Sequence, residues 1–545
     1  MSPSELVRLP RRAAAALLAA AAFLSVPTFA VAAQPGHKHH AEAKASASTK
    51  SRATTKARGR ATRRGAAARA RRTVARAAPV VRPGYVAPRS AADLNTALAN
   101  LLSRREDGRW GVMVVSLSRG DTLFAREPDA PVLPASTMKM FTSVLAFDRL
   151  GPDWRFRTEV LRTGPLEADG TVRGDLVVRG DGDPSFSRRF WGGGPYGTGY
   201  DAPARALARR VAQAGVRHVT GGVVGDASAF EARTVPDGWL TRYAGLAYAA
   251  PFGALSMNEN VVVVDVSPDG RVQLDPPTTG IRVENAVRVT GGSGAAVRVY
   301  RAADGHIVAR GAIGRSSRVM TPQVTVADPT TFAAGAVQRA LEAEGITVDG
   351  GLRTGAAPAG AAPVAELQSP PLRELVAVMN GESINHFAEL LFRDAARGPR
   401  RDSTGSAASG NALLGRFLTE QVGATPGAVT VTDGSGLSVL DRVTARAMVQ
   451  MLGYAHRAPF GPAFHASLPV AGESGLMRSR MAGTPAAGNL HAKTGTTDEV
   501  IALGGYVTAA GGEVLAFSFI FNGRDRWNAR ATIDAMGATM AGFTR

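Results

Sequence analysis

A serine and a lysine three residues apart open an apolar stretch, "LPASTMKMFTSVLAFD" at residues 133–148. A serine hydroxyl becomes an effective nucleophile when a base lies within hydrogen-bond reach. On a helix, positions i and i+3 share a face, so Lys139 can lie beside Ser136, and a first-turn serine gains free backbone N–H groups near a developing oxyanion. The lysine must be neutral to accept the proton, which requires a desolvated site or nearby cations. Taken alone, the pair fits a nucleophile with its base as well as two ordinary helix residues.

Two later motifs make the catalytic interpretation more specific. "SIN" at residues 383–385 stands just before or within the first turn of a predicted helix, and "KTG" at residues 493–495 stands on a predicted strand. S-x-x-K, S-x-N and K-T-G in this chain order are the three elements of the penicillin-recognising serine acyltransferases. Their joint occurrence is far more specific than any one of them.

The spacing of the motifs separates two branches of these enzymes. Ser383 follows Ser136 by 247 residues and precedes Lys493 by 110. Single-domain β-lactamases have a much shorter first interval. The chain instead resembles the D-alanyl-D-alanine carboxypeptidase/endopeptidase family, the class C low-molecular-mass penicillin-binding proteins, which insert two extra domains after the S-x-x-K helix. The resemblance runs from about residue 92 to the C-terminus and includes "GDGDPSFS", "ALSMNEN", "DGSGLS" and "LPVAGESGLMRSRM".

The resemblance implies a role for each of five catalytic residues. Ser136 is expected to attack the carbonyl with Lys139 as its base. Ser383 is expected to relay a proton to the leaving amine, and the amide of Asn385 to hold both the substrate backbone and Lys139. Lys493 is expected to supply positive charge to Ser383 and to the substrate carboxylate.

Three neighbours of Lys493 are expected to bind substrate. The hydroxyls of Thr494 and Thr496 are expected to bind the substrate carboxylate, and Gly495 to let the substrate lie against the strand edge without a clashing Cβ. The backbone N–H groups of Ser136 and Thr496 are the expected oxyanion hole. The resemblance implies no metal or cofactor.

Four positions depart from the family pattern without removing a catalytic group: Ile384, Val439, Asp441 and Thr497. Ile384 is expected to matter little because the flanking side chains do the bonding, and Val439 and Asp441 are expected to alter local packing after "DGSGLS". Thr497 is expected to alter the pocket for the penultimate substrate residue.

Three residue pairs or motifs outside this set favour structural roles. Asp433 and Ser435 are expected to build a turn near the site. His386 and Glu389, one helical turn apart, favour surface or helix–helix contacts over metal binding. "GDGDPS" lacks the third glycine of a dinucleotide loop, and Pro184 argues against the required helix. A Gly-x-Ser-x-Gly elbow is absent, which excludes a serine triad of that type.

The formal charge of +19 is concentrated at one end of the chain. Residues 1–33 contribute about +2 and residues 34–89 about +14, so the rest of the chain is nearly neutral and nucleic acid is not an expected partner. Residues 1–33 have the basic start, apolar run and small residues of a secretory signal peptide, with an uncleaved anchor as the alternative. Residues 34–91 are predicted to be a disordered basic linker that either contacts anionic wall polymers or a membrane surface, or is a solvated spacer.

The pattern of elements predicts an α/β (α+β) fold, with strands and a helix near each end of the chain and helices between. The resemblance specifies a β-lactamase/transpeptidase-like domain, helices around an antiparallel sheet, interrupted by a large insertion that forms two smaller domains. The expected boundaries are 92–154 and 365–545 for the transpeptidase-like domain, 155–257 and 321–364 for an inserted α/β domain, and 258–320 for a nested β-rich domain. Residues 204–224 and 332–352 resemble each other, either as matching halves of the α/β domain or by chance.

The expected function is that of an exported serine-type D-Ala-D-Ala carboxypeptidase, endopeptidase or both, in the periplasm or cell-wall space, soluble or peripherally attached. Its expected partners are peptidoglycan stem peptides and β-lactam antibiotics. A β-lactamase and a cell-wall-binding protein without turnover are the alternatives.

Overall fold

The computed structural model describes residues 87–103, 108–191 and 199–545. The predicted signal peptide and nearly all of the predicted basic linker lie outside these residues. In the described part of the chain, no helix combines the length and apolar character needed to cross a bilayer.

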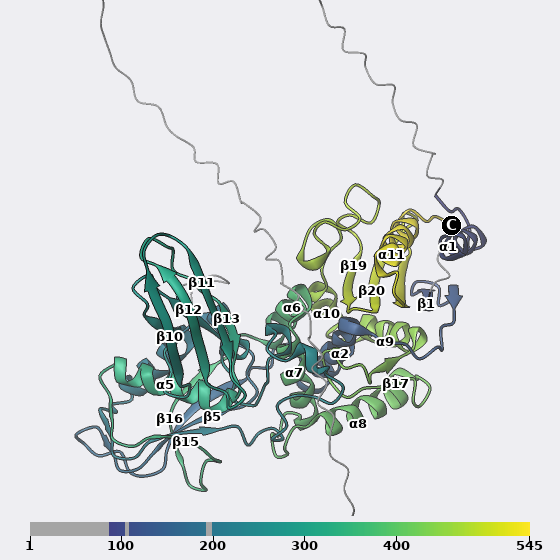
Figure 1. Ribbon diagram of the computed structural model, residues 1–545. Coiled ribbons are helices and arrows are strands. Elements are labelled where there is room, and N and C mark those ends of the chain that lie inside the picture. The colour runs from purple at the N-terminus through teal and green to yellow at the C-terminus, as the bar shows by residue number, and fades with distance from the viewer. Residues whose placement is uncertain (1–86, 104–107, 192–198) are drawn as a thin grey trace, which may run out of the picture. The chain divides into compact units, whose positions relative to one another are not determined.

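The sheet that carries K-T-G is built from both ends of the sequence (Figure 1). Its five antiparallel strands run in the order β19-β20-β21-β1-β2, with Trp110 opposite Phe521 where the two chain ends meet. The prediction of one sheet with members at both ends is therefore confirmed. The strands are β1 (Arg109–Ser116), β2 (Thr122–Arg126), β19 (His491–Thr496), β20 (Val500–Thr508) and β21 (Val514–Asn522).

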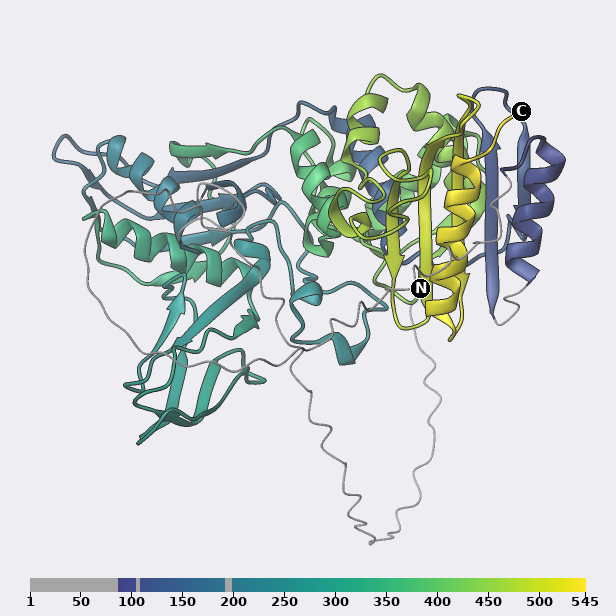
Figure 2. The ribbon, with the colours of Figure 1, turned by 90° about the horizontal axis from the view of Figure 1, so that it is seen from above.

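Both faces of this sheet are covered, so successive side chains enter different cores. Val112 and Val114 pack with α1 (Ala91–Ser103) and α11 (Arg526–Ala541), whereas Met113 packs on the opposite face. Figure 2 shows α1 and α11 beside the sheet. Helix α1 begins at Ala91, and the Asp93 N–H donates to Ser90 Oγ at 3.1 Å.

The opposite face is covered by the predicted central helices. Helix α2 is buried around most of its circumference, with Met138, Met140 and Phe141 fully enclosed. It contacts α6, α7 and α9, which fixes its position between sheet and helices. The elements of this layer are α2 (Met138–Leu150), α6 (Leu372–Glu382), α7 (Asn385–Arg397), α8 (Ala407–Phe417), the π-turn η5 (Leu418–Val422), β17 (Val429–Thr430), β18 (Arg442–Val443), α9 (Ala445–Arg457), α10 (Gly461–Ser467) and the 3₁₀ turn η6 (Gly475–Met477).

The two resembling segments lie side by side in the region between α2 and α6. Strand β14 pairs in parallel with β6, β15 pairs in parallel with β7, and helices α4 and α5 contact each other. The two segments therefore build one α/β layer. Its elements are β3 (Arg157–Arg162), β4 (Thr171–Val172), β5 (Leu176–Gly180), α3 (Arg188–Trp191), α4 (Ala202–Gln213), β6 (His218–Val219), β7 (Val223–Asp226), α5 (Pro329–Ala343), β14 (Thr347–Val348), β15 (Leu352–Thr354) and β16 (Ala362–Gln368).

Two three-stranded sheets lie in the sequence between these halves. One has the order β13-β8-β9 and the other β10-β12-β11. Because β13 begins at Gln323, the first sheet includes residues beyond the expected nested segment 258–320, and the domain boundaries stay a prediction. The elements are the 3₁₀ turns η2 (Thr241–Tyr243), η3 (Ala247–Ala249) and η4 (Asn258–Asn260), and β8 (Val261–Val266), β9 (Val272–Asp275), β10 (Val283–Thr290), β11 (Ala295–Arg301), β12 (Ile307–Gly314) and β13 (Gln323–Thr325).

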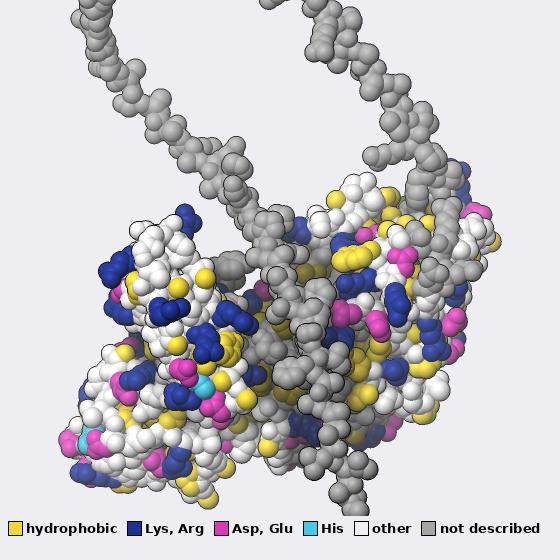
Figure 3. All heavy atoms as spheres, in the orientation of Figure 1, with side chains coloured by type: hydrophobic (Ala, Val, Ile, Leu, Met, Phe, Trp, Pro, Cys, Tyr) yellow, Lys and Arg dark blue, Asp and Glu magenta, His cyan; other side chains and the backbone are white. Residues whose placement is uncertain are grey.

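Charges of both signs are interspersed over the described surface seen in Figure 3. This distribution agrees with a nearly neutral body and with basic charge concentrated in the first 89 residues.

Candidate active site

Ser136 lies in a short 3₁₀ turn, η1 (Ala135–Thr137), directly before α2. Ser136 is therefore not in the first turn of the α-helix itself, as predicted, but in a tighter 3₁₀ turn that leads into α2. Ala135 has a φ of 46°, a conformation that is strained for a residue with a Cβ. The turn is held from two sides: a Cβ on Gly436 would lie 1.9 Å from the Ala135 carbonyl oxygen, and one on Gly495 would lie 2.8 Å from the Pro134 carbonyl oxygen. Only glycine permits these close backbone approaches.

Lys139 is the fully buried residue at the centre of the site. Its Nζ lies 3.0 Å from Ser136 Oγ, 2.6 Å from Asn385 Oδ1 and 2.8 Å from the carbonyl oxygen of Ser435. Burial lowers the pKa of Lys139 to about 7, although the carboxylates of Asp433, Glu389 and Asp441 oppose the shift. A large neutral fraction is therefore present near pH 7, as a general base requires.

The S-x-N segment joins two helices beside this lysine. Ser383 caps α6 in the left-handed conformation, and α7 begins at Asn385, so the predicted position at a helix start is confirmed. Asn385 accepts from Lys139 through Oδ1 and donates through Nδ2 to the Tyr248 carbonyl oxygen at 2.8 Å. One amide hydrogen of Asn385 remains to face a substrate carbonyl.

Lys493, the first residue of the K-T-G motif, contacts the S-x-N segment. Its Nζ donates to Ser383 Oγ at 2.9 Å and to the Thr494 carbonyl oxygen at 2.9 Å. Burial, and then the charge of Lys139, lowers the pKa of Lys493 well below its usual range. Two buried lysine side chains thus contact Ser136 and Ser383, and the charge of Lys139 disfavours the charge of Lys493.

A buried acidic cluster, Asp433, Asp441 and Glu389, lies behind Lys139. Asp433 accepts from the backbone N–H groups of Ser435, Gly436 and Ser438, which confirms the predicted turn. This turn aims the Ser435 carbonyl oxygen at Lys139, and Trp239 Nε1 donates to Asp433 Oδ2 at 2.8 Å.

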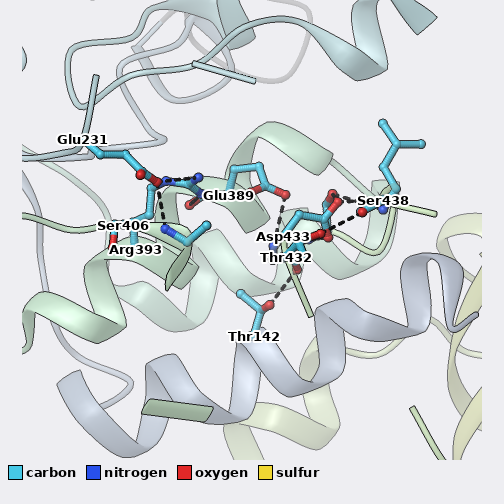
Figure 4. A network of polar contacts seen from close by, with 12 residues as sticks. Thr142, Glu231, Glu389, Arg393, Ser406, Thr432, Asp433 and Ser438 are labelled. Carbon is cyan, nitrogen blue, oxygen red and sulfur yellow. Dashed lines mark hydrogen bonds and ion pairs between the residues drawn. The ribbon is translucent and has the colours of Figure 1, made fainter. Parts of the chain in front are cut away.

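Figure 4 shows Glu389 between Arg393 and the Asp433 turn. Glu389 pairs with Arg393 at 2.9 Å and accepts from the Gly434 N–H at 3.2 Å. Burial raises the pKa of Glu389 to about 7, with Asp433 adding to the rise and Arg393 opposing it. His386 and Glu389 are both buried, so of the two predicted alternatives, surface contact and helix–helix contact, surface contact is excluded.

The substrate side of the site is a cavity of about 220 Å³. Ser136, Ser383, Asn385 and Thr496 line it, together with residues from the segment 241–249 and the turn after β19. Thr497, the departure from the family pattern, is in this wall, whereas the largely buried Thr494 is not. Since β19 is an edge strand, its outer backbone groups can pair with an extended peptide.

Several contacts could not be found from the motifs. The Ser435 and Tyr248 carbonyl oxygens hold Lys139 and Asn385, and a backbone acceptor leaves no residue-type signal. Tyr243 and Tyr248 in the cavity wall come from the insertion, over 100 residues from any motif. For the Ser435 contact, the sequence "DGSGLS" was the one available signal, because a glycine-rich segment with an aspartate predicts a turn in which the aspartate side chain caps backbone N–H groups.

In the described part of the chain, no group of three or more His, Cys, Asp or Glu side chains has an arrangement that could hold a metal ion.

Comparisons with known proteins agree with this arrangement. The model of the D-Ala-D-Ala carboxypeptidase 3 (S13) family matches residues 91–542. The chain is 32% identical over 456 residues to the D-alanyl-D-alanine carboxypeptidase of Actinomadura sp. (strain R39). The aligned region covers 79% of this chain and 81% of that protein. It is 30% identical over 474 residues to a carboxypeptidase of Mycobacterium tuberculosis, and the aligned region covers 83% of this chain and 87% of that protein.

A solved structure has the same fold. Penicillin binding protein 4 from Haemophilus influenzae superposes with a TM-score of 0.67 at 24% identity, over 81% of this chain and 97% of that chain. A second structure of that protein, in complex with a β-lactam, gives a TM-score of 0.64 at 22% identity, over 82% of this chain and 99% of that chain. The expected transpeptidase-like α/β fold with a large insertion is thereby confirmed.

Proposed function

We propose that this chain, which belongs to the D-Ala-D-Ala carboxypeptidase 3 (S13) family, is a serine-type hydrolase that cleaves D-Ala-D-Ala termini or D-Ala cross-links of peptidoglycan stem peptides. The observation that carries the proposal is the position of Lys139 Nζ, 3.0 Å from Ser136 Oγ in a site where burial favours the neutral amine.

The reaction follows from this geometry in two halves. Neutral Lys139 takes the proton of Ser136 Oγ as the oxygen attacks the carbonyl carbon, and the oxyanion is held by the backbone N–H groups of Ser136 and Thr496. Ser383, which accepts a hydrogen bond from Lys493, delivers its proton to the departing amine and is reprotonated by the proton that Lys139 took from Ser136, so an acyl-serine ester and a neutral Lys139 remain. Water then hydrolyses the ester, with Lys139 again accepting a proton.

The substrate is held between β19 and Asn385. Thr496, which lines the cavity, binds the carboxylate of the leaving D-amino acid, and the free amide hydrogen of Asn385 binds the carbonyl on the acyl side. Gly495 keeps the strand surface flat. A β-lactam presents a strained amide with a carboxylate at a similar distance, so it acylates Ser136 as well.

The activity is tested with purified muropeptides, a pentapeptide monomer and a cross-linked dimer. D-alanine released from the monomer measures carboxypeptidase activity, and conversion of dimer to monomers measures endopeptidase activity. We expect wild type to perform one or both, and the Ser136→Ala variant to perform neither. Binding of muropeptides by wild type with no cleavage of either would instead identify a wall-binding protein. Rapid steady-state hydrolysis of benzylpenicillin without muropeptide cleavage would identify a β-lactamase.

Export to the periplasm or wall space belongs to the same proposal. The support is the signal-like composition of residues 1–33, and the basic composition of residues 34–91 supports contact with anionic wall polymers or lipid headgroups. Fractionating cells that express the full chain and a chain lacking residues 34–91 tests both. Equal wall association of the two chains would contradict a binding role for the basic segment.

A further inference from the structure

A series of polar contacts joins the insertion to the catalytic lysine through Arg393 on α7 (Figure 4). The Arg393 side chain is fully buried, and its guanidinium pairs with Glu231 of the insertion at 3.2 Å and with Glu389 at 2.9 Å. The centre of the Phe252 ring, also from the insertion, lies 4.5 Å from the guanidinium carbon. Because a buried charge is costly without partners, Arg393 depends on both carboxylates.

The start of α8 fixes the position of the Glu231 carboxylate. The Glu231 N–H donates to the Gly405 carbonyl oxygen at 2.9 Å, and Glu231 Oε1 accepts from the Ala407 N–H at 2.8 Å. The same oxygen atom accepts from Arg393. These contacts orient the carboxylate so that its negative charge faces the guanidinium.

Glu389 connects Arg393 to the glycine-rich turn that precedes β18. Glu389 Oε1 accepts from the Gly434 N–H at 3.2 Å. Two contacts then lead from the turn to α2: Thr142 Oγ1 donates to the Gly434 carbonyl oxygen at 2.6 Å, and Lys139 Nζ donates to the Ser435 carbonyl oxygen at 2.8 Å. An unbroken series of contacts therefore runs from Glu231 to the catalytic base.

We propose that Glu231 is a positioning residue for the catalytic base, which holds Arg393 so that Glu389 and the turn keep their places beside Lys139. Glu231 does not line the catalytic cavity, so it acts through Arg393 rather than on substrate. This inference rests on the proposed function, in which Lys139 is the base, and it gives the insertion a part in acylation.

The charge of Glu231 also affects which groups beside Lys139 are ionised. Burial raises the pKa of Glu389 to about 7, and the charge of Arg393 opposes this rise. Without the Glu231 charge, Glu389 is the one carboxylate that pairs with Arg393 among the described residues, so Glu389 should lose its proton more readily. Ionised Glu389 favours the ammonium form of Lys139. Loss of the Glu231 charge is therefore expected to raise the pKa of Lys139.

The direct effect of Glu231 on Lys139 has the opposite sign but acts over a longer distance. The carboxylates that raise the pKa of Lys139 are Asp433, Glu389 and Asp441, and Glu231 is not among them. The effect through Glu389 should therefore prevail. The other titratable or charged groups that face Lys139 and Glu389 are His386 and Arg393 on α7, Asp433 and Asp441 at the turn, and Lys493 on β19.

Two of these groups do not change their charge near pH 7. Burial lowers the pKa of His386 to about 3, so the imidazole is neutral. Burial, and then Asp433, raises the pKa of Asp441 well above its usual range, so this carboxyl group keeps its proton. Glu389 is therefore the group through which the Glu231 charge is expected to reach Lys139.

The test is the pH profile of benzylpenicillin acylation in Glu231→Gln. Glutamine keeps an oxygen that can accept from Arg393 and from the Ala407 N–H, but it removes the charge. We expect the midpoint of the profile to rise by about one pH unit, which slows acylation about fivefold at pH 7 and leaves the rate close to wild type at pH 9. Glu231→Asp keeps the charge and should move the midpoint by less than half as much.

Glu342→Gln is the matched control. Glu342 lies on α5, also in the insertion, and pairs with Arg339 at 2.9 Å on the surface, so the variant removes the same charge away from Arg393. It is expected to keep the wild-type midpoint. A rate in Glu231→Gln that falls equally at every pH, a midpoint that stays or falls, or an equal rise in Glu342→Gln would each overturn the inference.

Direct titration of Lys139 separates this inference from the proposed function. The chain has six lysines, of which only Lys139 and Lys493 lie in the part that the structure describes. NMR of protein labelled with [ε-¹³C]lysine therefore gives few signals, and the one missing in Lys139→Arg belongs to Lys139. We expect its pKa to be about one unit higher in Glu231→Gln than in wild type.

The two measurements give distinguishable outcomes. If penicillin does not acylate wild type but the pKa of Lys139 rises in Glu231→Gln, the hydrolase proposal fails and the coupling of Glu231 to Lys139 stands. If wild type is acylated and the pKa of Lys139 does not rise in the variant, only the inference on Glu231 fails.

Discussion

At the scale of single residues, the site depends on two lysines that are buried for different uses. Lys139 contacts Ser136, and Lys493 contacts Ser383. Burial favours the neutral amine in both, and the acidic cluster keeps the pKa of Lys139 from falling further. In the proposed mechanism, Lys139 is the base for attack and Lys493 is the hydrogen-bond donor to Ser383 on the leaving side.

The first prediction concerns the pH dependence of acylation. Lys139 has a lowered pKa of about 7, so the base form is lost as the pH falls through 7 and is nearly complete above 8. The second-order rate constant for benzylpenicillin acylation is expected to rise between pH 6 and 8 and then to level off. Lys139→Arg keeps the charge but cannot lose its proton, and should lower the rate by roughly 10³-fold or more.

Arg149→Gln, a charge change on the same helix away from the site, is the control and should keep the wild-type profile. A wild-type rate that is independent of pH from 5 to 9 would contradict a lysine base.

At the scale of elements, the Ser136 turn is positioned by backbone contact with β19 and with the turn at residues 433–438. The motifs predict which side chains react, and the close approach of three backbone segments sets the distances between those side chains. Glycine at 436 and 495 is the local requirement for that approach.

The second prediction concerns Gly436→Ala. Gly436 has a φ of 80°, and the added Cβ would lie 1.9 Å from the Ala135 carbonyl oxygen, which displaces the Ser136 turn. We expect penicillin acylation to slow by roughly a hundredfold. Gly423→Ala has a similar φ of 76° with open space around the Cβ, so it adds the backbone strain alone, about 1 kcal/mol, and should acylate normally. Equal acylation rates in the two variants would disprove the role of this contact.

The third prediction compares two aspartates of the acidic cluster by thermal and denaturant unfolding. Burial, and then Asp433, raises the pKa of Asp441 well above its usual range. Asp441 ionises near pH 4 in the unfolded chain but keeps its proton in the folded chain. The folded protein therefore becomes less stable as the pH rises above 4. Asp441→Asn mimics the protonated form and should be more stable than wild type at pH 7.

Asp433→Asn should act in the opposite direction. Asp433 Oδ1 accepts the Ser435 and Gly436 N–H groups, and Oδ2 accepts the Ser438 N–H and the Trp239 indole N–H; an asparagine replaces one of these oxygens with an amide nitrogen, which cannot accept its two donors. We expect a loss of about 2 to 4 kcal/mol. Stabilisation by both variants, or by neither, would contradict the assignment of the proton to Asp441.

At the scale of the whole molecule, the insertion contributes directly to the catalytic region. Trp239 bonds the Asp433 turn, the Tyr248 carbonyl oxygen bonds Asn385, and Glu231 contacts the buried Arg393 at 3.2 Å. The long interval between S-x-x-K and S-x-N is therefore part of the site, and the insertion completes it.

The fourth prediction tests this contribution with Trp239→Phe. The substitution keeps the contact with the Phe252 ring but removes the N–H that donates to buried Asp433. We expect about 1.5 to 3 kcal/mol lower stability and slower penicillin acylation. Trp527→Phe changes an exposed ring, 62% accessible, and should alter neither. Unchanged acylation in Trp239→Phe would mean that the insertion does not act on the turn.

The sequence predicted the parts whose signal is local. The three motifs, the two-ended sheet and the repeated helix–strand segments follow from residue type and periodicity, and residue type also predicted a turn at Asp433. Long-range contacts through backbone carbonyls, such as Tyr248 with Asn385, leave no such pattern. The sequence left surface and helix–helix contact open for His386 and Glu389, because α7 is enclosed around most of its circumference and its own periodicity does not indicate this.

The central claim is that Ser136 is the acylated nucleophile. Wild type and Ser136→Ala are incubated with benzylpenicillin, digested, and mapped by peptide mass spectrometry. The claim predicts one penicilloyl group on the wild-type peptide that contains Ser136 and none in the variant. A penicilloyl group on any other residue of wild type, or covalent uptake by Ser136→Ala, would contradict it.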